Sequence, residues 1–135
     1  MSIAYLALGS NLGDRMMYIR RAIQELKDQG VEVLKVSSMI ETDPVGGPAQ
    51  SKYINGAIKI RTSLSPEALL GVINQIEHRL GRIRDIVNGP RVIDIDILLY
   101  DEIKLVSRRL MIPHPRMYER DFVMKPLKDI QPDLC

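Results

Sequence analysis

Residues 92–100 read Val-Ile-Asp-Ile-Asp-Ile-Leu-Leu-Tyr, the clearest strand pattern in the chain. Apolar and charged residues alternate through its first part, and a period of two is typical of a strand with one buried face. The three isoleucines then point into a core, while Asp94 and Asp96 share the opposite face, about 7 Å apart. The stretch therefore predicts a half-buried strand that carries two carboxylates side by side.

The two aspartates are unusual in such a strand. Aspartate is poorly suited to strands, and like charges on one face repel each other, so the arrangement needs a compensating cation. Two carboxylates at this spacing can hold one or two hard cations such as Mg²⁺, which also coordinate substrate phosphates. An ordinary solvated face of an edge strand is the alternative.

Arginines gather around this strand. Eight of the chain's twelve arginines lie between residues 79 and 120, and Arg82, Arg84 and Arg91 bracket the loop that leads into the strand. A guanidinium group binds phosphate or carboxylate through two parallel hydrogen bonds. Arginines and Mg²⁺ are the groups that phosphoryl transfer uses, and the chain has no P-loop sequence. A solvated charged surface is the alternative for the arginines.

The rest of the chain predicts a single domain, residues 1–135, with an α+β fold. We expect strands at residues 3–8, 31–40 and 53–61. Helices follow the predicted caps Asp14 and Ser65. With the strand at 92–100, the order is the ferredoxin-like βαββαβ arrangement, with both helices on one sheet face and the other face free for a site. A C-terminal hairpin within residues 102–112 and one or two short helical turns after Pro113 complete the prediction.

Composition fits an ordinary globular protein, with 45% hydrophobic and 27% charged residues. The one cysteine, Cys135, excludes an internal disulfide. No stretch approaches the roughly 18 consecutive apolar residues of a membrane span, and the first residues do not resemble a signal peptide. We therefore expect a cytoplasmic protein that does not associate with membranes.

Aromatic side chains are scarce, which makes their positions informative. There is no tryptophan, and Phe122 is the one phenylalanine. A flat substrate needs rings to stack on, and Phe122 beside Arg120 and Tyr53 beside Asn55 are the candidates. His114, between two prolines, is a candidate contact for a phosphate or a base.

The segment Gly89-Pro90-Arg91-Val92-Ile93-Asp94-Ile95-Asp96-Ile97-Leu98-Leu99 resembles the signature of the 6-hydroxymethyl-7,8-dihydropterin pyrophosphokinases of folate biosynthesis. Further segments match that family in order and spacing: residues 7–14, 37–44, 53–55, 77–84 and 112–116. The resemblance implies a ferredoxin-like enzyme with two Mg²⁺ ions. It would transfer pyrophosphate from ATP to the pterin hydroxymethyl group and release AMP.

The resemblance also implies roles for individual residues. Those implied in catalysis are Arg82, Arg91, Asp94 and Asp96, and the two aspartates would hold both metal ions. Those implied in ATP binding are Glu77, Arg82, Arg84, Arg91, Ile97, Arg109, His114 and Arg120. Those implied in pterin binding are Thr42, Val45, Tyr53, Asn55 and Phe122, with the ring held between Tyr53 and Phe122.

Two other classes share this strand order. A nucleic-acid-binding module would carry aromatic residues on its central strands, where this chain offers two aspartates. A non-catalytic ligand-binding domain would not need Arg82, Arg91, Asp94 and Asp96 together. We therefore expect ATP and the hydroxymethyldihydropterin as partners, no nucleic acid, and a monomer.

Overall fold

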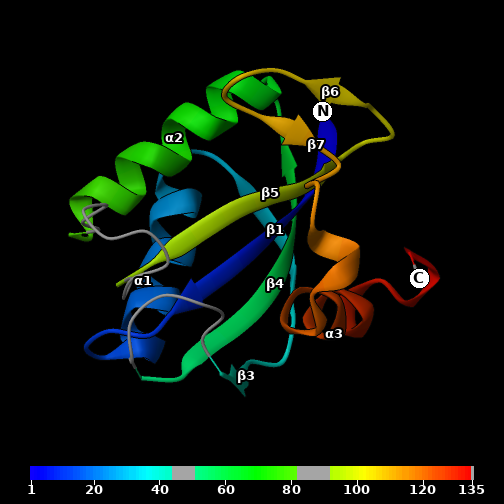
Figure 1. The fold of residues 1–135 in the computed structure, drawn as a ribbon. Coiled ribbons are helices and arrows are strands. Elements are labelled where there is room, and N and C mark those ends of the chain that lie inside the picture. Colours follow the sequence, from blue (N-terminus) through cyan, green and yellow to red (C-terminus); the bar gives the residue numbers. More distant parts are fainter. Residues whose placement is uncertain (44–50, 82–91, 135) are drawn as a thin grey trace.

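The computed structural model describes residues 1–43, 51–81 and 92–134, and its centre is an antiparallel sheet (Figure 1). The strands are β1 (Ser2–Ser10), β2 (Glu32–Val36), β3 (Ile40–Thr42), β4 (Tyr53–Thr62) and β5 (Asp94–Tyr100). Their order across the sheet is β2-β4-β1-β5, and β3 also pairs with β4. This confirms the predicted ferredoxin-like arrangement.

Two helices lie on one face of the sheet (Figure 1). They are α1 (Arg15–Asp28) and α2 (Pro66–Arg79). The predicted caps are confirmed, because Asp14 accepts a hydrogen bond from the Met17 N–H and Ser65 from the Ala68 N–H. Beyond the helix ends, Gly30 and Gly81 have φ values of 85° and 94°, which favour glycine.

The main core fills the space between these helices and the sheet. The isoleucines within β5 and the one directly before it point into this core, as predicted, and Ile93, Ile95 and Ile97 are each at most 4% exposed. They pack beside Leu6 and Leu8 of β1. Because side chains of a strand alternate, this burial turns Asp94 and Asp96 to the opposite face.

The predicted strand at residues 31–40 is wrong in one respect, because the structure divides it into β2 and β3. Ser37 lies at the break and is buried. Its N–H donates to the Ala57 carbonyl, and its Oγ accepts from the Ala57 N–H. The Ser37 hydroxyl therefore takes the place of one backbone carbonyl in the hydrogen bonding to β4. On either side of this break, β2 and β3 pair with the same edge of β4.

The tail also differs from the prediction of one or two short turns. A 3₁₀ turn at Met117–Glu119 precedes α3 (Asp121–Ile130), a helix of ten residues, and a second 3₁₀ turn follows at Pro132–Leu134. Pro126 lies inside α3, and proline usually interrupts a helix. The sequence therefore predicted only short helical turns where the structure has a helix of ten residues. Within the described residues, no helix is long and apolar enough to cross a membrane.

The buried face of α3 explains why this helix forms. Val123, Met124, Leu127 and Ile130 recur at helical spacing and make a second core with residues of the sheet, including Leu98. We expected the second sheet face to be free, but α3 covers part of it. In Figure 1, α3 lies against the sheet on the side away from α1 and α2. A site on this face must occupy the part that α3 leaves open.

Polar contacts tie the end of α3 to the sheet. Asp129 Oδ2 accepts the Ser38 N–H at 2.7 Å, directly after the break at Ser37. The Tyr5 hydroxyl donates to Gln131 Oε1, and burial raises the pKa of Tyr5. The C-terminal end of α3 is thereby held against the sheet.

The predicted hairpin is confirmed as β6 (Leu105–Val106) paired with β7 (Met111–Ile112). It follows a turn at Asp101, whose carboxylate accepts the Ile3 N–H at 2.8 Å. The hydrogen bond to the Ile3 N–H is the largest of the effects that lower the pKa of Asp101.

Candidate active site

A cavity of about 360 Å³ opens on the sheet face opposite α1 and α2. It gathers side chains from β3, β4, β5, the segment after β7 and the first turn of α3. The predicted site residues that line it are Thr42, Tyr53, Asn55, Asp94, Asp96, His114, Arg120 and Phe122. The fold therefore brings eight of the predicted residues together from these five parts of the chain.

Small residues of β1 form the floor of this cavity. Asp96 pairs with Ala7 and Asp94 pairs with Gly9 across the β1–β5 ladder. On the other side, Gly9 pairs with Asn55 of β4, and a Cβ atom at Gly9 would lie 2.8 Å from Asn55 Oδ1. The absence of a side chain at Gly9 keeps space open between the carboxylates and the amide.

The carboxylates suit a hard cation that arrives with a phosphorylated ligand. Among the residues that the structure describes, no group of three or more His, Cys, Asp or Glu side chains could hold a metal. Asp94 and Asp96 supply two carboxylates, and the other ligands must come from water or substrate oxygens. Mg²⁺ is usually bound in this way, through one or two carboxylates, several waters and phosphates. The residues present therefore fit Mg²⁺.

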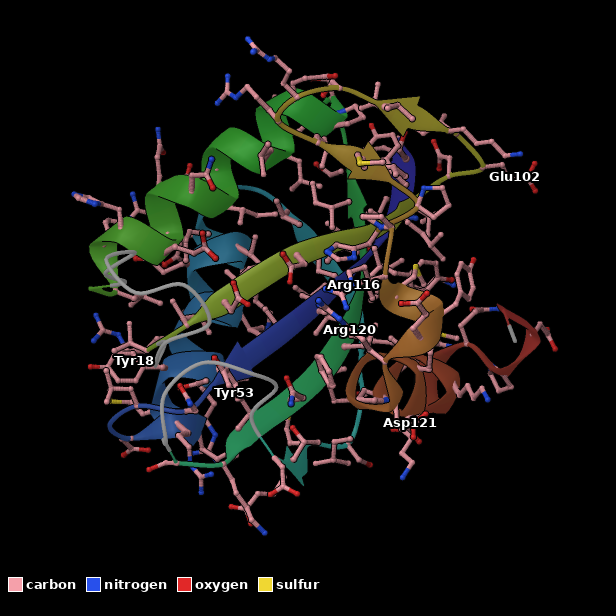
Figure 2. All side chains as sticks on the ribbon, in the orientation of Figure 1. Tyr18, Tyr53, Glu102, Arg116, Arg120 and Asp121 are labelled. Atoms are coloured by element: carbon pink, nitrogen blue, oxygen red, sulfur yellow. The ribbon has the colours of Figure 1, made fainter. Side chains whose placement is uncertain are left out.

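Cationic groups line the same cavity as the carboxylates. Arg116 and Arg120 flank the 3₁₀ turn before α3, and Figure 2 shows their side chains extending over the sheet. His114 is anchored to β5 because its N–H donates to the Leu98 carbonyl at 3.0 Å. Its Nδ1 accepts the Arg116 N–H, so the neutral ring carries its proton on Nε2. The cavity thus offers donors suited to phosphate oxygens.

The surroundings of His114 predict a pH dependence of stability. Burial, followed by the charge of Arg120, lowers its pKa below the ordinary value of 6.5, although Asp94 acts in the opposite direction. Just below pH 6.5 the unfolded chain binds more protons at this residue than the folded chain. The free energy of unfolding contributed by His114 therefore falls as the pH drops through this value.

This expectation can be measured on the protein without nucleotide. Proton NMR should show the His114 ring titrating below 6.5, with the signal assigned by its loss in His114→Asn. Urea denaturation at about pH 7.5 and about pH 5.5 should show a smaller loss of stability in the variant than in the unmodified protein. An equal loss in both would contradict the prediction.

The cavity also contains groups that suit a flat ligand with polar edges. Tyr53 and Asn55 come from β4, and the Asn55 amide donates through Nδ2 to the Thr42 hydroxyl of β3. Phe122, in the first turn of α3, has the Arg120 guanidinium carbon 5.5 Å from its ring centroid. Aromatic faces with an amide nearby can bind a heterocycle by stacking and read its edge by hydrogen bonds.

Some predicted residues do not reach this cavity with their side chains. Ile97 is 3% exposed within the main core, so only its backbone could contact a ligand on the other face. Glu77 of α2 is buried, and its Oε2 accepts the Ile95 N–H at 2.9 Å at the outer edge of β5. Arg109 is exposed in the β6–β7 connection. Four further predicted residues lie outside the described residues: Val45, Arg82, Arg84 and Arg91.

Other lining residues were missing from the predicted site. We expected the first strand to end at residue 8, but β1 continues through Ser10, so Gly9 belongs to the strand and to the cavity floor. Arg116 lies two residues after His114, in the segment 112–116 that matches the family. Its place in that segment could have identified it as a site residue. Leu98 and Val123 line the cavity where it meets the second core, and their apolar character alone gave no such signal.

Known proteins are similar to this chain over most of its length. The family model of 7,8-dihydro-6-hydroxymethylpterin-pyrophosphokinase (HPPK) matches residues 5–132. The 2-amino-4-hydroxy-6-hydroxymethyldihydropteridine pyrophosphokinase of Bacillus subtilis is 51% identical over 130 residues, which cover 96% of this chain and 78% of that protein. The protein of the same name from Aquifex aeolicus is 41% identical over 134 residues, covering 99% and 83%.

A solved structure supports the fold. The crystal structure of an HPPK-DHPS in complex with substrates superposes with a TM-score of 0.76 at 15% sequence identity, covering 98% of this chain and 42% of the larger one. This likeness extends over the whole ferredoxin-like domain. From the family match and the two relatives, the chain belongs to the HPPK family, the pyrophosphokinases of folate synthesis.

Proposed function

We propose that the chain transfers the pyrophosphoryl group of ATP to the hydroxymethyl oxygen of 6-hydroxymethyl-7,8-dihydropterin, with two Mg²⁺ ions, as a cytoplasmic monomer. The oxygen attacks the β-phosphorus of ATP and loses its proton to water. The bond from that phosphorus to the oxygen bridging it to the α-phosphorus breaks, and AMP leaves with the bridging oxygen. The product carries the pyrophosphate.

One observation carries this proposal: groups for a flat ring and groups for phosphates line the same cavity. Tyr53, Asn55 and Phe122, which suit a ring, line it. Asp94, Asp96, His114, Arg116 and Arg120, which suit phosphates and their metal ions, line it as well. A reaction that joins a heterocyclic alcohol to a polyphosphate needs both sets within one enclosed space.

The residues of the chain contribute mainly by positioning. Tyr53 and Phe122 hold the pterin ring, and Asn55 binds its edge. Asp94 and Asp96 bind the metal ions that accompany the triphosphate, and His114 and Arg120 donate hydrogen bonds to its oxygens. When bound, Mg²⁺ neutralises phosphate charge and makes the attacking hydroxyl more acidic. Phosphoryl transfer depends chiefly on such placement and charge neutralisation.

The remaining predicted residues stay in the proposal. Arg82, Arg84, Arg91 and Arg109 would contact ATP, with Arg82 and Arg91 stabilising the transferred group. Ile97 and Val45 would take part through their backbones. Glu77 would act through the Ile95 N–H, which lies between the two aspartates of β5.

A nucleic-acid-binding module is the second candidate class. The sheet face that such a module would use carries Asp94 and Asp96 and is partly covered by α3. Both features disfavour a phosphodiester backbone lying along the sheet. We therefore propose small molecules as the ligands.

Product analysis tests the proposed function. The purified chain is incubated with ATP, Mg²⁺ and 6-hydroxymethyl-7,8-dihydropterin, and the nucleotides are separated. AMP that forms only when the pterin is present supports pyrophosphoryl transfer. ADP in its place would indicate transfer of a single phosphoryl group, and no pterin-dependent product would contradict the proposal.

A further inference from the structure

The Asn55 side chain is held between two neighbours at the edge of the cavity. Asn55 lies in β4, is 8% exposed and lines the cavity. Its Nδ2 donates to Oγ1 of Thr42, the last residue of β3. Both the Asn55 amide and the Thr42 side chain therefore face the same space, and the hydrogen bond joins two strands that pair only over three residues.

The amide oxygen of Asn55 points toward β1 instead of β3. Asn55 Oδ1 faces Gly9 of β1, where a Cβ atom would lie only 2.8 Å away. Within the described part of the chain, no hydrogen bond to this oxygen is present. The amide thus has one hydrogen-bonding atom committed to the protein and one acceptor left at the cavity.

We propose that the Thr42 hydroxyl is a positioning group, which fixes the Asn55 amide so that Oδ1 accepts a hydrogen bond from a ring N–H of the substrate. This inference rests on the proposed function. It assigns to the Thr42 side chain a role in substrate recognition that it performs through Asn55.

The physical reason is that an amide without a hydrogen-bond partner can rotate about its last side-chain torsion. Rotation away from the observed position would turn Oδ1 out of the direction of a ligand N–H. The hydrogen bond from Nδ2 to Thr42 Oγ1 restrains this rotation before the substrate arrives. Preorganisation of this kind improves binding because less ordering remains to be done in the complex.

Thr42→Val is the direct test, because valine keeps the shape and the β-branched character of threonine but has no oxygen. The β3–β4 ladder uses the backbone of Thr42, so it should persist in this variant. We expect KM for the pterin to rise roughly threefold to tenfold, the effect of one ordinary hydrogen bond. KM for ATP and kcat should change by less than about twofold.

Thr42→Ser is the matched control. Serine retains the acceptor oxygen, so this variant should restore KM for the pterin to within about twofold of the unmodified enzyme. Binding of the pterin alone, measured by calorimetry without ATP, should show the same pattern. If Thr42→Val and Thr42→Ser weaken pterin binding equally, the hydroxyl has no positioning role and the inference is wrong.

A double-mutant cycle separates this role from a purely structural one. If Thr42 acts through Asn55, then Thr42→Val should have little further effect on pterin binding in an Asn55→Ala background. Independent, additive effects would overturn the inference, even if Thr42→Val lowers the melting temperature. Absence of pterin-dependent AMP from the unmodified chain would instead mean that the proposed function fails.

Discussion

Replacing either active-site aspartate by asparagine should lower kcat/KM by about a thousandfold or more. Asp94→Asn and Asp96→Asn each keep the side-chain shape but remove a negative charge from a pair that suits Mg²⁺. A bound metal ion supplies several kcal/mol of charge stabilisation in the transition state, and about 4 kcal/mol corresponds to a thousandfold change in rate. The measurement is steady-state turnover with ATP, Mg²⁺ and the pterin.

Folding should survive both substitutions, because the change removes repulsion between like charges on one strand face. Glu102→Gln is a suitable control, since Glu102 is exposed just beyond β5 and points away from the cavity (Figure 2). The Mg²⁺ dependence of ATP binding, followed by calorimetry, gives a readout that does not need turnover. Normal activity together with unchanged Mg²⁺ dependence in both variants would exclude the proposed role of the pair.

The parts of the fold that the sequence predicts well are those controlled by local chemistry. Alternation from residue 92 onward identifies β5 and assigns Asp94 and Asp96 to the face away from the main core. Asp14 and Ser65 mark helix starts because a short polar side chain can cap free N–H groups. Neither inference depends on residues far away in the chain.

The parts that the sequence predicts poorly depend on distant contacts. Ser37 interrupts a strand because its hydroxyl bonds to Ala57, twenty residues away. The helix α3 forms around Pro126 because its apolar stripe packs on Leu98 and other residues of the sheet, and its end is tied through Asp129 to Ser38. Such burial outweighs the local cost of proline, and no pattern within the tail reveals it.

The site shows the same division. Sequence reasoning placed Tyr53, Asn55 and the aspartates on candidate strands, but which strands lie side by side is set by sheet order. The small residues of β1 illustrate the point: Gly9 matters because it lies between Asn55 and Asp94 in the ladders, a position that its own neighbours in sequence do not indicate.

Phe122→Ala should weaken pterin binding roughly tenfold to a hundredfold, while binding of ATP alone should change far less. Phe122 lies far from Tyr53 in the sequence, but both side chains line the same cavity. Stacking of a heterocycle on an aromatic side chain contributes about 1–3 kcal/mol, which corresponds to this range. Calorimetric titration of the pterin against the variant gives the change directly.

Two further variants decide whether the ring itself is responsible. Phe122 also packs against the second core, so alanine should lower stability as well as binding. Phe122→Leu keeps most of the apolar volume but has no ring, and it should therefore retain stability while still weakening the pterin complex. Tyr118→Ala removes an exposed ring, 62% accessible in the neighbouring 3₁₀ turn, and should leave binding unchanged. Full pterin affinity in Phe122→Leu would mean that apolar packing, rather than stacking on an aromatic face, holds the substrate beside α3.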